Sequence, residues 1–163
     1  MKYLIAFLLG LSVSLNAFAE DHRFGLGVIL GDPTAVSGKY YYANDRAIDG
    51  AVSIVHNDYV VLWGDSLYHF PGMLGKYKPL QKIVPYFGFG VIAALATKSH
   101  HLEGNFFDKH DDKFAIGVRI PFGLEWIWDK VPLGIGFELV PGVIVAPATM
   151  GALQGGLTLR YYF

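Results

Sequence analysis

Large apolar residues alternate with small or polar residues in short segments along most of this chain. Residues 113–128 show the alternation most clearly, because every even-numbered residue there is large and apolar. Successive side chains of a β-strand point to opposite faces, so such a segment is predicted to be a strand with one apolar face. The polar residues of the same segment then share the opposite face.

The same period of two, interrupted by turn signals rich in Gly, Pro, Asn and Asp, predicts eight strands. They cover residues 24–30, 36–42, 48–54, 59–68, 84–96, 113–128, 133–145 and a last strand that ends at Phe163. Pro121 and Pro141 cannot donate to a strand ladder and are expected to mark bulges. A break at Pro121 would raise the count to nine. The predicted fold class is all-β.

The closing stretch of residues 155–163 indicates where such a fold is located. Leu157, Leu159, Tyr161 and Phe163 share one face, and Phe163 is the last residue. An apolar face that reaches an aromatic end is typical of a strand that meets lipid outside and a polar barrel interior inside. The stretch also resembles the terminal signal that the barrel assembly machinery of the bacterial outer membrane recognises. A soluble barrel is the alternative.

Residues 1–19 are predicted to be a cleaved signal peptide. Lys2 supplies the charged start, residues 3–15 form a mostly apolar run, and Ala17 to Ala19 read as a cleavage site. Residues 20–163 then form one domain, as the usual size of domains suggests.

Composition supports a membrane location without helical spans. The chain is 53% hydrophobic and 15% aromatic, yet no apolar run after residue 19 approaches the length of a membrane helix, which is about 20 residues. Short alternating strands with lipid-facing sides explain both facts. The net charge of −1 argues against a nucleic-acid binder. Without cysteine the chain has no disulfide framework and no lipid-modified Cys.

A transmembrane antiparallel up-and-down barrel of eight strands has both termini on the periplasmic side. In that topology the aromatic residues of many strands fall at one membrane edge, as expected for an interfacial belt. These residues are Phe24, Tyr40, Tyr42, Tyr68, Phe87, Phe89, Trp126, Trp128, Tyr161 and Phe163. The longest loop, 97–112, lies outside the cell. Loop 70–82 lies on the periplasmic side, where turns are normally short, and its role is unexplained.

The inward face combines glycines with a few charged residues of both signs. By parity the charged set is Lys39, Asp49, Asp65, Arg119, Glu125, Glu138 and Arg160. Buried charges must be paired, so we expect the pairs Lys39–Asp49, Arg119–Glu138 and Glu138–Arg160. Eight strands leave an interior that side chains can fill, so a plugged barrel is predicted. A proton path or narrow pore is the alternative.

The outer loop 97–112 contains the remaining candidate chemistry. His100, His101 and His110 are weak candidates for metal ligands, because their spacing matches no standard site. The apolar pair Phe106 and Phe107 is a candidate surface contact.

An outer-membrane lipid hydrolase or acyltransferase is an alternative of a different class, with Asp65, Ser66 and His69 close together in the sequence. Asp65 and Ser66 point to opposite faces of a strand, which does not suit a triad. No motif predicts a cofactor, and the chain is not expected to be an enzyme.

Several motifs occur in an order that resembles small eight-stranded outer-membrane barrel proteins, in particular a barrel family recorded mainly as a domain of unknown function. They are residues 25–34, 37–40, 47–51 and 117–124, with the closing residues 160–163. The resemblance implies an outer-membrane barrel and no catalytic residues. Some members bind host or environmental ligands through outer loops, but the first two such loops are very short in this chain.

The sequence therefore predicts an integral outer-membrane barrel with a structural or surface-interaction role through loop 97–112. Its expected partners are outer-membrane lipid and lipopolysaccharide, the barrel assembly machinery, and a surface ligand of unknown identity.

Overall fold

The described part of the chain consists of strands in one antiparallel sheet with almost no helix. The structure, a computed structural model, describes residues 23–55, 59–76, 80–96, 114–128 and 131–163. Its nine strands are β1 (Phe24–Asp32), β2 (Ala35–Ala43), β3 (Arg46–Val55), β4 (Tyr59–His69), β5 (Ile83–Ala96), β6 (Phe114–Arg119), β7 (Phe122–Ile127), β8 (Leu133–Ala146) and β9 (Met150–Tyr162). No helix in these ranges is long and apolar enough to cross a membrane, a finding that does not bear on spans made of strands.

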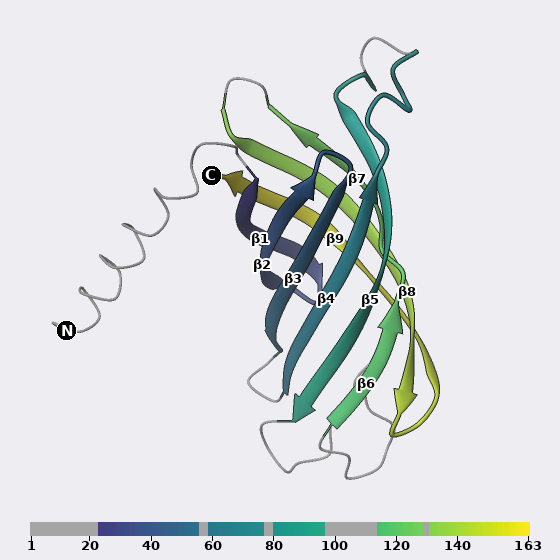
Figure 1. The fold of residues 1–163 in the computed structure, drawn as a ribbon. Coiled ribbons are helices and arrows are strands. Elements are labelled where there is room, and N and C mark those ends of the chain that lie inside the picture. The colour runs from purple at the N-terminus through teal and green to yellow at the C-terminus, as the bar shows by residue number, and fades with distance from the viewer. Residues whose placement is uncertain (1–22, 56–58, 77–79, 97–113, 129–130) are drawn as a thin grey trace, which may run out of the picture.

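The strand pairings close into a ring (Figure 1). Strands β1 to β5 pair in chain order, β6 and β7 both pair with β5 and with β8, and β9 pairs with β8 and β1. Because β6 and β7 share one position, the ring has eight positions. Every strand is therefore hydrogen-bonded along both edges, and the sheet has no free edge.

The predicted count of eight strands differs from the nine observed, because the predicted strand 113–128 is divided into β6 and β7. The break falls at Ile120 and Pro121, where proline lacks the backbone N–H of a regular ladder. The Pro121 carbonyl still accepts a hydrogen bond from Gly88, and Ile120 donates to the carbonyl of Pro141. The bulge expected at Pro141 is not found, since β8 passes through it in unbroken register with β9.

We call the end of the ring where β1 begins and β9 ends the proximal end, and the opposite end the distal end. The loop between β4 and β5 projects at the proximal end (Figure 1). It folds through consecutive turns in which Gly75 donates to the Gly72 carbonyl at 2.9 Å. Gly72 adopts a φ of 78°, a conformation that residues with a Cβ rarely adopt.

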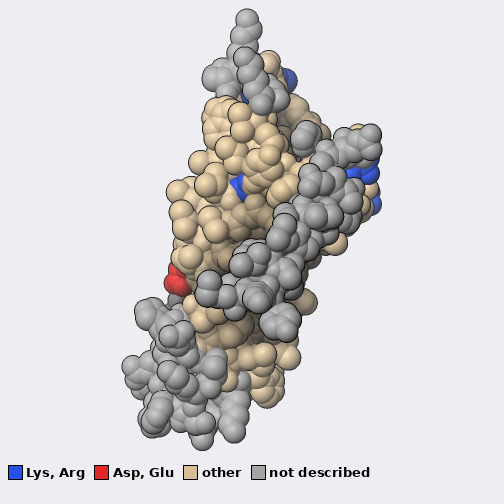
Figure 2. All heavy atoms as spheres, turned by 90° about the vertical axis from the view of Figure 1, so that its left-hand side faces the viewer, with Lys and Arg blue, Asp and Glu red and all other residues tan. Residues whose placement is uncertain are grey.

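The two faces of the sheet differ in chemistry. Outward positions are almost all apolar, and Figure 2 shows one side of the ring on which few charged atoms interrupt the surface. In the described strands the only charged residues that face outward are Asp32 and Arg46, which are the last residue of β1 and the first residue of β3. Inward positions hold small, polar and charged side chains.

The interior is layered along the ring axis. An apolar cluster fills the distal part, where Ile29, Val61, Trp63, Ile92 and Ile144 pack with several alanines. A smaller cluster of Ala47, Leu67 and Tyr86 lies nearer the proximal end. The charged side chains fill the space between and beside these clusters.

Inward glycines allow neighbouring strands to pack closely. Replacing an inward glycine with alanine should therefore destabilise the fold more than replacing an outward glycine. A Cβ on inward Gly117 would lie 2.6 Å from the Val143 carbonyl oxygen, whereas a Cβ on outward Gly64 would meet nothing closer than 3.8 Å. Gly117→Ala should therefore lower the free energy of unfolding by about 1–3 kcal/mol. The control Gly64→Ala should change it by less than about 0.5 kcal/mol. Urea unfolding of the chain folded in detergent micelles would measure both, and equal losses would contradict the packing account.

Candidate functional site

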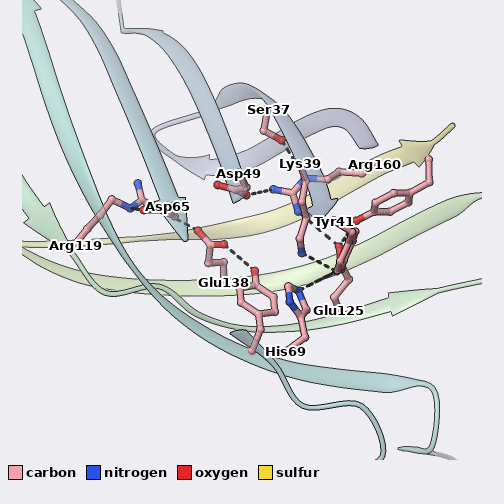
Figure 3. Close-up of polar contacts among 12 residues, drawn as sticks. Ser37, Lys39, Tyr41, Asp49, Asp65, His69, Arg119, Glu125, Glu138 and Arg160 are labelled. Atoms are coloured by element: carbon pink, nitrogen blue, oxygen red, sulfur yellow. Dashed lines mark hydrogen bonds and ion pairs between the residues drawn. The ribbon is translucent and has the colours of Figure 1, made fainter. Parts of the chain in front are cut away.

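The most concentrated chemistry in the described residues is a network of buried charges inside the ring (Figure 3). The structure places all seven inward charged residues predicted from the sequence in this interior, each at most 7% exposed. They come from seven different strands and comprise four carboxylates and three cations: Lys39, Asp49, Asp65, Arg119, Glu125, Glu138 and Arg160. Such charges are costly to bury unless they are paired and hydrogen-bonded, so their mutual geometry decides the stability of the interior.

Glu125 on β7 is the centre of the proximal half of the network. Its carboxylate accepts hydrogen bonds from Lys39 Nζ at 2.7 Å, from Tyr41 Oη at 2.6 Å and from Tyr162 Oη at 2.6 Å. A guanidinium nitrogen of Arg160 lies 3.7 Å away. Both carboxylate oxygens are therefore satisfied, and the negative charge is shared between two cations.

The Lys39–Glu125 pair spans the interior. β2 and β7 are four positions apart in either direction round the ring, so the two residues come from opposite walls. Lys39 is fully buried, with no exposed surface. Its ammonium group also lies 4.7 Å from the centre of the Tyr86 ring and 5.1 Å from that of Tyr41, where cation–π attraction adds to the ion pair.

Arg119 is the centre of the distal half. It lies 3.1 Å from both Asp65 and Glu138, donates to the Gln154 side chain at 3.2 Å, and stacks over the Trp63 ring at 4.9 Å. The contact with Glu138 is an aligned hydrogen bond, whereas that with Asp65 is an ion pair without hydrogen-bond alignment.

Arg160, on β9, extends the proximal half of the network to Asp49 and Ser37. Its guanidinium donates to Asp49 at 2.8 Å and to the Ser37 hydroxyl at 3.3 Å. The network therefore runs without a gap from Glu125 through Arg160 to Asp49.

Of the three ion pairs predicted from the sequence, only Arg119–Glu138 is present. Lys39 and Asp49 are direct partners in the strand register, but the Lys39 ammonium extends across the interior to Glu125. Arg160 likewise contacts Asp49 and not Glu138. The predictions of these two pairs were wrong because long side chains in a narrow ring reach walls beyond the neighbouring strand.

Sequence reasoning did not include four aromatic members of the network. Tyr41, Tyr86 and Tyr162 each donate to a buried glutamate at 2.6–2.7 Å, and His69 Nε2 lies 3.2 Å from the Tyr41 hydroxyl. Their parity was the available signal, since Tyr41 and Tyr162 share a face with Lys39 and Arg160. Tyrosine on an inward face supplies a donor that a buried carboxylate needs.

The group Asp65, Ser66 and His69 is not assembled as a triad. Asp65 and His69 face the interior, and Ser66 lies on the opposite face of β4. The hydroxyl therefore has no access to the imidazole, as expected from the parity of Asp65 and Ser66.

Of the ten aromatic residues predicted for an interfacial belt, eight lie on strands toward the proximal end, and Trp128 and Phe163 directly follow β7 and β9. Several contact one another across or along strands, including Tyr68 stacked on Phe87 at 5.7 Å and Phe24 near Phe163 at 6.4 Å. Trp126 stacks on Trp128 at 4.7 Å, and Tyr161 meets Phe163 edge to face. Tyr40, Tyr42 and Phe89 expose 38%, 44% and 57% of their surface.

The candidates in the outer loop lie outside the described residues. They are His100, His101 and His110, predicted as weak metal ligands, and Phe106 and Phe107, predicted as a surface contact. The predicted signal peptide, residues 1–19, is also outside. Within the described ranges, no three His, Asp or Glu side chains are grouped so that they could hold a metal ion.

A cavity of about 370 Å³ opens at the proximal end, beside Glu125. We call it the proximal vestibule. Its polar lining comes from three strands, the β2–β3 turn and the β4–β5 loop: Tyr41, Asn44, His69, Gln81, Lys82 and Glu125. Near the distal end, by contrast, the gap beside Trp63 and Arg119 has a volume of only about 10 Å³. Of these two cavities among the described residues, the proximal one is therefore the larger.

The chain matches no protein-family model, and no curated protein or solved structure is significantly similar to it. The resemblance to a barrel family of unknown function therefore stays a prediction.

The geometry predicts that Glu125 is the costliest carboxylate to remove. Glu125→Ala would leave the buried Lys39 ammonium and two tyrosine hydroxyls without an acceptor, so the free energy of unfolding should fall by about 3–5 kcal/mol. Removing both charges in Lys39→Met with Glu125→Gln should cost less than the sum of the single changes, because the two groups interact directly. Urea unfolding of the unmodified chain, of Lys39→Met, of Glu125→Gln and of the double variant would give this coupling energy. Additive losses would contradict a direct pair.

Proposed function

We propose that this protein is an integral β-barrel of the bacterial outer membrane, with a plugged, charge-networked interior and a structural or surface-interaction role through the outer loop 97–112. Export would depend on the predicted signal peptide, and insertion on the barrel assembly machinery, with the last strand as its recognition element. Its surroundings would be outer-membrane phospholipid and lipopolysaccharide. The narrow pore and the lipid-modifying enzyme remain alternatives of other classes.

The observation that carries this proposal is the inverted distribution of charge in the described strands. Seven charged residues face inward and are buried, while outward positions between the strand ends carry large exposed apolar residues on every strand. Val36, Phe89 and Leu153, for example, expose 64%, 57% and 65% of their surface. A water-soluble protein has the opposite arrangement, and lipid is the solvent that favours this one.

Backbone hydrogen bonding supports the same proposal. A sheet in hydrocarbon must satisfy every backbone N–H and C=O group internally, which an open sheet edge prevents. In this ring each strand has partners along both edges, and β1 pairs with β9 over eight residue pairs.

The aromatic residues support an orientation with the proximal end toward the periplasm. Aromatic side chains favour the boundary between lipid and water, and those of this ring gather toward the proximal end. The β4–β5 loop and the start of β1 and end of β9 then lie on the periplasmic side, and loop 97–112 on the outer side. The pairing of the interior charges favours a structural or binding role over conduction.

A charged side chain on the outer face provides a direct test of lipid contact. Outward Val118, on β6, is paired with Val91 and Val143 near mid-height of the ring, whereas Ile54 lies near the distal end of β3. In a membrane, Val118→Arg should make folding into vesicles less favourable by about 2–4 kcal/mol, and the control Ile54→Arg by about 0–1 kcal/mol. Equal small effects of both variants would contradict insertion.

The orientation can be tested by labelling, because the chain contains no cysteine. A membrane-impermeant maleimide applied to intact cells should label Asp108→Cys, in loop 97–112. It should label Met73→Cys, which is 68% exposed in the proximal loop, only after the outer membrane is opened. The reverse result would invert the orientation, and recovery of both variants in the soluble periplasmic fraction would refute membrane insertion.

A further inference from the structure

The inward charges of the described strands do not balance. Four carboxylates face three cations, and each of these seven side chains belongs to a residue that is at most 7% exposed. His69 does not supply a fourth cation, because a protonated imidazole carries N–H at both ring nitrogens and its buried Nδ1 has no acceptor. An uncompensated charge is costly in an interior shielded from water, so the excess negative charge must be neutralised.

Two of the four carboxylates receive donors on both of their oxygens. Glu125 accepts hydrogen bonds from Lys39 and two tyrosines, as described above. Glu138 accepts one from the Tyr86 hydroxyl at 2.7 Å on one oxygen and one from Arg119 at 3.1 Å on the other. These are the surroundings that an ionised carboxylate requires, since it can only accept hydrogen bonds. The excess charge therefore lies on the two aspartates.

Asp49 and Asp65 are neighbours that lack donors (Figure 3). They are register partners on β3 and β4, and their side chains lie within hydrogen-bonding range of each other. Asp49 accepts from Arg160 at 2.8 Å through one oxygen, and its other oxygen has no hydrogen bond. Neither oxygen of Asp65, which is 4% exposed, has a hydrogen bond, and its contact with Arg119 at 3.1 Å is not aligned as one. Two ionised carboxylates in this arrangement repel each other, and neither has a proton to donate.

The charged groups on the surrounding strands do not compensate this pair. Each nearby cation is shared with a glutamate: Arg119 with Glu138 of β8, and Arg160 with Glu125 of β7. Lys39 of β2 extends to Glu125. No charged residue of β1 or β5 faces the interior. One negative charge on the aspartate pair is therefore left without a cation of its own.

We propose that the interior of the ring binds one proton, held between the neighbouring carboxyl groups of Asp49 and Asp65. The O–H of one carboxyl group then donates to an oxygen of the other, which supplies the missing hydrogen bond. The proton also reduces the negative charges of the interior from four to three, equal to the number of cations. Loss of this proton would place two like charges on adjacent strands, so the ring contains a pH-sensitive element between β3 and β4.

Infrared spectroscopy of the full chain, folded in detergent micelles at neutral pH, tests for the proton directly. A protonated carboxyl group has a C=O stretching band that an ionised carboxylate lacks. The band is expected in the unmodified chain and should be absent from Asp65→Asn and from Asp49→Asn, because each variant leaves three carboxylates for three cations. The matched control Asp32→Asn, which changes an exposed aspartate at the end of β1, should keep the band. Absence of the band from the unmodified chain, or its persistence in either interior variant, would overturn the proposal.

The bound proton also makes the stability of the ring depend on pH. An aspartate of the unfolded chain ionises near about pH 3.9, so above that pH the folded chain holds one proton more than the unfolded chain. Stability then falls as the pH rises. While the proton stays bound, the folding equilibrium constant of the unmodified chain should fall about tenfold per pH unit relative to that of Asp65→Asn. Urea unfolding of both proteins in micelles between about pH 5 and about pH 7 would measure this ratio. A ratio that does not change with pH would contradict the bound proton.

Discussion

The pairing of Glu125 with Lys39 is the interaction on which the interior of the ring depends. A lysine with no exposed surface requires a carboxylate within direct reach, and this one comes from the opposite wall. The same carboxylate receives two tyrosine hydroxyls and a second cation, so side chains of β2, β7 and β9 meet at one group. The pairing therefore connects opposite strands through the interior, in addition to the backbone hydrogen bonds between neighbouring strands.

Pairing of charges in the interior also explains why the two faces of the sheet differ in composition. Because charges are gathered and neutralised inside, the outer face can be apolar along nearly its whole height. Glycines on the inner face leave room for the long side chains, as at Gly136, where a Cβ would meet the Thr158 hydroxyl at 2.6 Å. Small and polar residues on the inner face therefore accompany large apolar residues on the outer face.

Strand positions, faces and interior charges could be predicted from the sequence because all three follow from a local period of two. Arg119 and Glu125 keep the same parity through the break at Pro121, so their inward placement was readable although the division into β6 and β7 was not settled. The partner of Lys39 could not be predicted, because it depends on which strand lies across the ring. The vestibule was equally hidden, since it requires the folded β4–β5 loop and the turn at Asn44 to come together.

The pairing of β1 with β9 joins the two ends of the described fold, from Gly25 with Tyr162 to Asp32 with Gly155. Contacts between segments so distant in sequence form slowly, because a long intervening chain must first be brought to order. Until that seam forms, β1 and β9 each retain an unpaired edge that can associate with other chains. Closing the ring therefore removes two exposed strand edges at once, because the β1–β9 pairing satisfies both.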